Sequence, residues 1–330
     1  MKKIISGMQP TNALHLGNYL GAIKGWLSCV DKGYDSIAFI ADLHAITVLQ
    51  DPKKLRENVF ALAATYIACG LDIKKCPIFV QSSVAEHSEL AWILSCFTAG
   101  GWLNRMTQYK EKSAKYKDSA SLGLYSYPVL QAADILLYQV DYVPVGEDQK
   151  QHVELTRDIG EAFNRQTNTS TFKIPDYMSV ESTGARIMSL RDGTKKMSKS
   201  DESDYSRINL SDDADLIRLK IRKAKSDSIR EVYYDKENRP EVSNLLNIYS
   251  SFSGRSAKEI EVDYQSKLVS DFKNDLAEIL VDKLSPIAKE YHRLLKEKDY
   301  LRVVLDEGRE IASSRARDTL GKVKQAVGLI

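Results

Sequence analysis

Residues 3–18 read KIISGMQPTNALHLGN, in which a short apolar run leads through a polar turn into an amphipathic stretch. A β-branched run of this kind is typical of a buried strand, and the stretch after the turn has helical spacing. Free N–H groups at a helix start attract anions, and Gly17 lets a nucleotide approach without a Cβ in the way. His15 and Asn18 can donate hydrogen bonds to phosphate, so the turn predicts a phosphate site, although His15 alone would also suit an ordinary helix face.

The same alternation of apolar runs and amphipathic stretches continues through the first half of the chain. Asp51 and Ser83 are candidate caps before two of the expected helices. Repeated strand–helix units imply a parallel sheet with right-handed crossovers. The predicted fold class is therefore α/β: a doubly wound, Rossmann-like nucleotide-binding domain with an α-helical C-terminal domain. Strands are expected at residues 3–6, 36–41, 77–81 and 140–145, and helices at residues 17–30, 52–69, 86–99 and 130–138.

The other stretches are assigned by composition and periodicity. Residues 106–123 are polar and lysine-rich, which indicates a loop or part of an insertion, and residues 165–183 indicate a loop-rich connection. From Ser211 onward apolar residues recur at helical spacing, and Pro286 is expected to kink or break one helix. The predicted organisation is a nucleotide-binding domain at residues 1–190 with an insertion around 85–130, a lysine-containing loop and linker at 191–210, and a helical domain at 211–330.

Composition narrows the class of protein. A net charge of +2 means that nucleic acid would have to be held by local basic patches. Cys29, Cys69, Cys76 and Cys96 form no CxxC pair, so we expect buried free thiols in a reducing compartment and no zinc or iron-sulfur cluster. The sequence has no apolar segment of signal-peptide or membrane-spanning length, which predicts a cytoplasmic protein without a membrane partner.

A second motif, GTKKMSKS, lies at residues 193–200. Lysines are compact cations on long flexible stems, so they can follow the charge of a triphosphate as it reacts. A generic lysine cluster is more simply a solvated basic loop. The pairing of this motif with the phosphate-binding turn favours a role in phosphate chemistry.

Together the two motifs resemble the paired signatures of class I aminoacyl-tRNA synthetases: HLGN at 15–18 after QPT, and KMSKS at 196–200. The resemblance covers most of the chain. Five further blocks resemble bacterial tryptophanyl-tRNA synthetases in order and spacing: ADLHAIT at 41–47, MTQYKEKS at 106–113, AADILLY at 132–138, VPVGEDQKQHVELTRDI at 143–159 and GARIMSL at 184–190. With these blocks the resemblance implies an enzyme that joins L-tryptophan to tRNA(Trp) with ATP, a homodimer, and a region at residues 211–330 that binds the tRNA anticodon.

The resemblance also implies roles for single residues. Mg²⁺ is expected to be held mainly by the ATP phosphates and water, with no protein ligand set for a metal. Asp148, after a strand and a glycine turn, suits the ribose hydroxyls, although an acidic helix start would look the same; Ile187 is expected at the adenine and could instead be core. The implied catalytic residues are His15, Lys112, Lys196 and Lys199. ATP is expected at Gln9, Pro10, Thr11, Gly17, Asn18, Gly146, Glu147, Asp148, Ile187, Lys196, Met197, Ser198, Lys199 and Ser200.

Asp134 is the residue expected to select the amino acid. It interrupts the apolar stretch AADILLY, and an indole N–H is a pure donor that needs an acceptor. A substrate without that N–H would leave a buried carboxylate unpaired and would be rejected. A structural aspartate paired with a nearby basic or hydroxyl group is the alternative. The rest of the tryptophan pocket is expected from Tyr127, His44, Gln131, Val143 and Gln149, with Tyr127 and Gln149 at the ammonium and carboxylate.

Three residues depart from the family pattern. Asn12 stands where many members have glycine, Gln131 where some have methionine, and Ile5 where some have an aromatic residue. Asparagine tolerates a positive φ, so the turn can survive. Gln131 adds a polar group beside the indole, and both it and Ile5 put the expected indole packing in doubt.

The sequence leaves other functions to be tested. A tyrosine-specific synthetase shares both signatures, because a phenol can also donate to Asp134. A small-metabolite nucleotidyltransferase would carry a similar histidine turn without needing the helical tail, and a catalytically dead RNA-binding paralogue would not need both signatures. The basic run at Arg218, Lys220, Arg222, Lys223 and Lys225 is a candidate tRNA contact or a solvated helix face.

Overall fold

The computed structural model describes residues 1–11, 13–108, 121–179, 186–199 and 201–330. Within these residues, parallel strands form a five-stranded sheet in the order β3-β2-β1-β4-β5. The chain order reverses at β1, as in doubly wound folds, so the predicted fold class is confirmed. The strands are β1 (Lys3–Met8), β2 (Asp35–Ile40), β3 (Ile78–Val80), β4 (Tyr142–Val145) and β5 (Asp176–Ser179).

Strand β5 lies within residues 165–183, where the sequence predicts a loop-rich connection. It pairs with β4 from Tyr142↔Asp176 to Val145↔Ser179. β5 is an edge strand of four residues, and Tyr177 is 38% exposed. A short edge strand buries too little apolar surface to leave a periodic signal, because backbone pairing with its neighbour defines it.

Helices follow the strands and then fill the second half of the chain. Each predicted helix has a counterpart in the structure, and α3, α6 and α9 are additions. The helices are α1 (Leu16–Asn18), α2 (Lys24–Asp31), α3 (Asp42–Ala45), α4 (Pro52–Ala68), α5 (Glu86–Ser95), α6 (Gly100–Asn104), α8 (Leu122–Leu136), α9 (Lys150–Thr167), α10 (Ala214–Lys223), α11 (Pro240–Ser253), α12 (Ala257–Asp263), α13 (Val269–Lys296) and α14 (Lys298–Ala326), with a π-helical turn η1 (Tyr19–Ile23) and 3-10 turns η2 (Gln81–Ser83), η4 (Glu147–Gln149) and η5 (Asp204–Ser206).

Several helix boundaries differ from the prediction. Asp51 caps α4 as expected, accepting from the Lys54 N–H at 2.8 Å, but the Ser83 hydroxyl donates to the Val80 carbonyl and caps nothing. Helix α8 begins eight residues before the predicted start, because the Ser121 side chain caps it and Pro128 is accommodated inside. Helix α13 likewise continues through Pro286, so of the expected kink or break the break does not occur: one missing N–H does not end a helix of 28 residues.

Alternate residues of the strands face two hydrophobic clusters. Ile4 belongs to a cluster with α2, α4 and the C-terminal helices, and Ile5 belongs to a second cluster with α5, α8 and α9. Gly7 pairs with Phe39 in the register of β1 and β2, and a Cβ on Gly7 would lie 2.3 Å from the Phe39 ring. The sheet is therefore packed on both faces.

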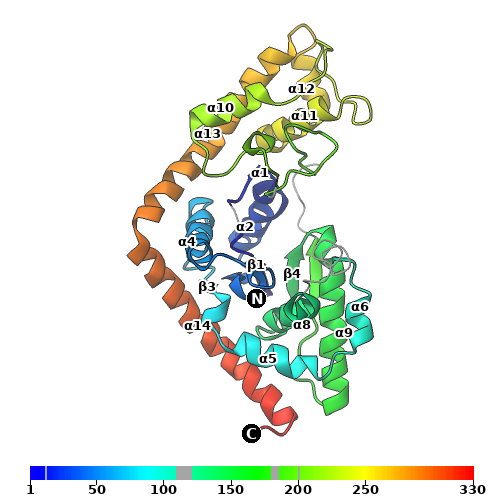
Figure 1. The fold of residues 1–330 in the computed structure, drawn as a ribbon, viewed down its shortest axis with the longest axis vertical. Coiled ribbons are helices and arrows are strands. Elements are labelled where there is room, and N and C mark those ends of the chain that lie inside the picture. The colour runs from blue at the N-terminus through cyan, green and yellow to red at the C-terminus, as the bar shows by residue number, and fades with distance from the viewer. Residues whose placement is uncertain (12, 109–120, 180–185, 200) are drawn as a thin grey trace.

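Helices α13 and α14 run along one side of the molecule, from the α10–α12 group past β3 to the C-terminus (Figure 1). A Cβ at Gly308 would lie 1.9 Å from the Ile78 carbonyl oxygen, so a glycine lets the backbone of α14 touch the edge strand. No helix of the described residues is long and apolar enough to cross a membrane.

The cysteines are free, as predicted, but they are not all buried. Cys76 is buried, whereas Cys96 is exposed because it follows the last turn of α5 on the surface. No group of three or more His, Cys, Asp or Glu side chains suited to a metal lies within the described ranges.

Candidate active site

The turn after β1 presents a histidine in a defined orientation. His15 is the N-cap of α1, and its Nδ1 accepts from the Gly17 N–H at 3.1 Å. The His15 N–H in turn donates to Asn18 Oδ1 at 3.1 Å, which completes a capping box. Because Nδ1 is an acceptor, the ring proton resides on Nε2, where it can be donated to an anion.

His15 is neutral at physiological pH. Burial, with the positive charges of Lys199, Arg207 and Lys196, lowers the pKa of His15 to about 4. A phosphate bound there would meet a neutral N–H donor in a field made positive by the surrounding cations.

The lysine loop reaches this turn, so the structure brings the two sequence motifs together. Lys199 Nζ donates to the Thr11 carbonyl at 3.1 Å, and burial lowers the pKa of Lys199 to about 8. The Met197 N–H donates to the Ile187 carbonyl at 3.1 Å, and both side chains are buried in the first hydrophobic cluster. Lys196 pairs with Met188 in an isolated bridge. The loop is thus anchored by its apolar residues, with Lys199 directed at the turn.

The segment after the loop pairs with the turn. The Leu16 N–H donates to the Ile208 carbonyl at 2.8 Å, and the Leu210 N–H donates to the Leu14 carbonyl at 2.9 Å. Backbone bonds on both sides of His15 therefore hold the histidine against this segment.

A buried ion cluster supports the same segment. Lys220 is 1% exposed, with Nζ 2.6 Å from Asp212 and 2.7 Å from Asp204. Asp212 also accepts from the Asn209 N–H at 2.9 Å, and Asn209 forms a bridge with His15. Lys220 is therefore neither a tRNA contact nor part of a solvated helix face, the two interpretations that the sequence offered, because it is buried between carboxylates. Nothing in the basic run around it marks this one lysine as buried.

The predicted ribose residues follow β4, at the carboxyl edge of the sheet beside β1. Gly146 leads into η4, which contains Glu147, Asp148 and Gln149 and runs into α9. Glu147 pairs with Lys150 at 2.7 Å, while Asp148 Oδ2 accepts from Gln149 Nε2 at 3.2 Å. These carboxylates lie in the first turn of a helix, so the geometry fits both ribose binding and a favourable dipole contact.

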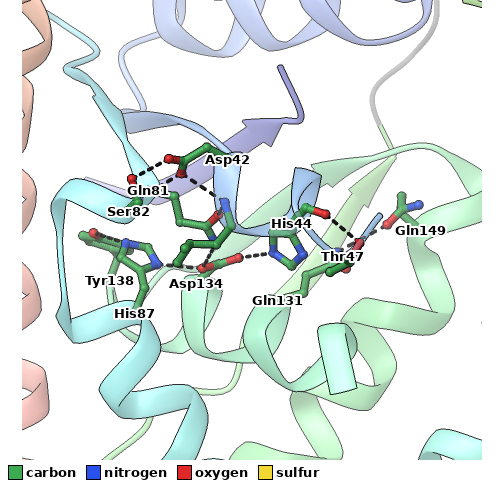
Figure 2. Close-up of polar contacts among 11 residues, drawn as sticks. Asp42, His44, Thr47, Gln81, Ser82, His87, Gln131, Asp134, Tyr138 and Gln149 are labelled. Atoms are coloured by element: carbon green, nitrogen blue, oxygen red, sulfur yellow. Dashed lines mark hydrogen bonds and ion pairs between the residues drawn. The ribbon is translucent and has the colours of Figure 1, made fainter. Parts of the chain in front are cut away.

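Asp134 is the centre of a buried polar network (Figure 2). It is 0% exposed, and its Oδ2 accepts from His44 Nε2 at 2.7 Å. Its Oδ1 accepts from Gln81 Nε2 at 2.7 Å and from His87 Nδ1 at 2.6 Å. These interactions outweigh the effect of burial and lower the pKa of Asp134 to about 2, so the carboxylate is ionised.

Tyr127, Gln131 and Gln149, three of the other predicted pocket residues, have partners of their own. The Tyr127 hydroxyl lies 2.9 Å from His152 Nε2, and the Tyr127 ring meets the His44 ring edge-on at 6.3 Å. Gln131 Nε2 donates to Gln149 Oε1 at 3.3 Å, so the two glutamines lie together on the His44 side of Asp134 (Figure 2). Val143 on β4 is buried in the second hydrophobic cluster.

Sequence reasoning missed the residues behind Asp134. Gln81 and His87 are 0% exposed and Tyr138 is 4% exposed. The available signal was Gln81 directly after an apolar strand, where side chains of parallel sheets converge on ligands. Lys112, Ser200 and Asn12 lie outside the described residues.

The sequence matches the family described as tRNA synthetases class I (W and Y) over residues 1–285. The chain belongs to this family. A tryptophan--tRNA ligase of Rickettsia conorii is 53% identical over 329 residues, which cover 100% of this chain and 99% of that protein. A tryptophanyl-tRNA synthetase from Mycoplasma pneumoniae has a TM-score of 0.86 at 34% identity, covering 99% of this chain and 98% of that one. One from Campylobacter jejuni, complexed with ADP and tryptophan, has a TM-score of 0.85 at 35% identity and covers 99% of both chains.

In this synthetase the class signatures meet through Lys199 and Thr11. The strand order of the Rossmann-like sheet of this synthetase reverses at β1, so the turn after β1 and the residues after β4 follow neighbouring strands. Ligands of such sheets bind at this edge, which the turn after β1 and the residues after β4 flank.

Proposed function

We propose the following division of roles for the residues of this tryptophan--tRNA ligase. The enzyme activates L-tryptophan with ATP, releases pyrophosphate and transfers the tryptophanyl group to tRNA. The contact of Lys199 with the Thr11 carbonyl is the observation that supports the assignment best, since it joins the two phosphate-handling motifs in one site.

ATP is bound between the signature turn and the residues after β4. Gln9, Pro10, Thr11, Gly17 and Asn18 form the turn that receives the phosphates. Gly146, Glu147 and Asp148 meet the ribose, and Ile187 borders the adenine. Mg²⁺ arrives with ATP and is held mainly by phosphate oxygens and water, as magnesium usually is at nucleotide phosphates. Met197, Ser198 and Ser200 of the lysine loop are assigned to ATP as well.

Activation needs no covalent enzyme intermediate, because the tryptophan carboxylate is already a competent nucleophile. It attacks the α-phosphate, and the leaving pyrophosphate carries the developing negative charge. His15 donates through Nε2, while Lys112, Lys196 and Lys199 stabilise that charge as it moves. The neutral state of His15 makes it a hydrogen-bond donor throughout the cycle.

Tryptophan is selected by Asp134. Its Oδ1 carries two hydrogen bonds and its Oδ2 carries one, so Oδ2 retains one acceptor position for the indole N–H. His44, Tyr127, Gln131, Val143 and Gln149 complete the pocket, with Tyr127 and Gln149 toward the ammonium and carboxylate. Gln131 provides a polar wall, and its bond to Gln149 orients it.

The enzyme works as a homodimer. Ile46, Leu49, Trp92 and Leu122 are 57%, 97%, 74% and 78% exposed, unusually high values for large apolar side chains. Ile46 lines a hollow of about 290 Å³ together with Ser88, Ser121 and Gly123, which lie close to Trp92 or Leu122 in the sequence. A second copy of this chain covers these apolar side chains in a closed symmetric dimer. Trp92→Glu is expected to yield monomers in sedimentation; an unchanged mass would remove this surface from the interface.

The tRNA is bound by the helical region at residues 211–330. The enzyme acts in the cytoplasm, a reducing compartment in which free thiols such as those of its cysteines persist. Arg218, Arg222, Lys223 and Lys225 are all exposed, but Arg218 is paired with Glu278 at 2.7 Å and Lys225 with Glu241 at 2.8 Å. Arg222 and Lys223 are therefore the members of the basic run assigned to tRNA phosphates. Phosphate contacts of this kind weaken as salt rises.

An amino-acid-dependent ATP–pyrophosphate exchange panel tests the proposal. Tryptophan is expected to drive exchange, and tyrosine and phenylalanine are not. Asp134→Asn should lower kcat/KM for tryptophan strongly, since the carboxamide offers a weaker acceptor, while leaving the KM for ATP near its original value. Exchange driven by tyrosine would transfer the assignment to a tyrosine enzyme, and loss of ATP binding in Asp134→Asn would contradict the role of Asp134.

A further inference from the structure

Three buried side chains that the proposed roles do not use lie behind Asp134, on the side away from Gln131 (Figure 2). Gln81 and His87 donate to Asp134 Oδ1 at 2.7 and 2.6 Å. His87 Nε2 lies 2.8 Å from the Tyr138 hydroxyl. Tyr138 and His87 therefore form a hydrogen-bonded series that ends on Asp134 Oδ1, and Gln81 donates to the same oxygen.

The direction of these bonds fixes the tautomer of His87. A carboxylate only accepts, so His87 Nδ1 carries a proton and donates to Asp134. The rings of Phe39, Phe79 and Tyr138 surround the imidazole with centroids 5.9, 5.7 and 5.5 Å away, and the Tyr138 hydroxyl lies 2.8 Å from Nε2. Nε2 is then the acceptor for the Tyr138 O–H, a phenol whose pKa burial raises.

These hydrogen bonds also limit which acceptor positions remain on Asp134. Gln81 cannot turn its amide around, because its Oε1 accepts from the Leu43 N–H at 3.2 Å. Both lone pairs of Asp134 Oδ1 are therefore occupied by donors held from behind. Only Oδ2, which His44 shares, has room for another donor.

We infer that His87, Tyr138 and Gln81 are positioning residues that set the amino-acid specificity of the synthetase, by holding Asp134 so that its one remaining acceptor position faces the substrate. The inference rests on the proposed function, in which that position receives the indole N–H. Without the Tyr138 hydroxyl, Nε2 of His87 has no donor and the other tautomer becomes accessible. That tautomer points a lone pair at the carboxylate, which would turn away or take up a proton.

The test compares tryptophan with its benzothiophene analogue, which keeps the ring shape and lacks the N–H. Tyr138→Phe and His87→Leu are measured by kcat/KM in pyrophosphate exchange with each amino acid. For tryptophan a loss of ~10-fold or more is expected, as for other groups that orient a ligand residue, with little change for the analogue. His87→Asn retains a donor near the Nδ1 position and is expected to restore most of the preference.

Tyr66→Phe is the matched control, because Tyr66 is a phenol 1% exposed in the other hydrophobic cluster. It should leave the preference for tryptophan unchanged. An unchanged preference in Tyr138→Phe and His87→Leu, or equal losses for both amino acids, would overturn the inference. If the unmodified enzyme itself uses the analogue as well as tryptophan, the assignment of Asp134 as the indole acceptor fails instead.

Discussion

Replacing Lys220 by methionine tests whether the buried ion cluster supports the catalytic turn. Lys220 is 1% exposed and contacts two carboxylates of different exposure: Asp212 is 5% exposed, and the Asp204 side chain is 49% exposed. In Lys220→Met, Asp204 can turn to water, whereas Asp212 is left as an uncompensated buried charge. Removing one partner of a buried pair costs about 3–5 kcal/mol, so the variant should lose that much of its free energy of unfolding.

Two further measurements separate charge from packing. Burial already raises the pKa of Asp212, and the loss of Lys220 should raise it further. The unfolded carboxyl keeps its ordinary pKa, so below the raised folded pKa the variant recovers stability as Asp212 takes up a proton. The double variant Lys220→Met with Asp212→Asn removes the lone charge and keeps an acceptor for the Asn209 N–H. It should regain most of the lost stability at neutral pH.

The assay is urea unfolding at pH 5 to 8 for the parent and the two variants, together with pyrophosphate exchange. Because Asn209 bridges to His15, Lys220→Met should lower kcat for exchange in conditions where the protein is still folded. A Lys220→Met protein as stable as the parent, or a double variant no better than the single one, would refute the reasoning.

Three other outcomes follow from the structure. The pKa of His15 is about 4 in the folded protein against an ordinary 6.5, so the unfolded chain binds the proton first as pH falls. The free energy of unfolding should therefore decrease by ~3 kcal/mol in total between about pH 6.5 and about pH 4. An NMR titration that gives His15 a pKa near 6.5 would contradict this. Lys199→Met should lower the exchange rate by ~10²-fold, with a smaller effect on tryptophan affinity. In the parent, deprotonation of Lys199 near pH 8 should lower kcat/KM for ATP, and this alkaline fall should disappear in the variant. An unchanged rate would dismiss the assignment of Lys199. Gly7→Ala should cost ~1–3 kcal/mol in thermal unfolding, since its Cβ would lie 2.3 Å from the Phe39 ring, and Phe39→Leu in the same chain should recover part of it; full stability of the single variant would count against the packing argument.

The sequence alone determined the fold class and the two phosphate motifs. Local chemistry carries these features: apolar runs at strand spacing, and a glycine and histidine at the start of a helix. Asp134 was also identified locally, because a carboxylate in an apolar helix stands out against its neighbours. Strand β5 was missed, since a short edge strand at Asp176–Ser179 is defined by pairing with β4 and not by its own pattern.

Only the tertiary structure decided which polar groups meet. In the sequence Lys220 is one of several basic residues in a row, yet α10 places it in the core between two carboxylates. His87 and Tyr138 lie 47 and 4 residues from Asp134 along the chain, and neither spacing announces a shared hydrogen-bonded network. Burial and hydrogen-bond partners depend on how helices pack across the sheet. The charges and acceptors that set specificity are therefore properties of the folded chain, while the fold class is already present in the local pattern.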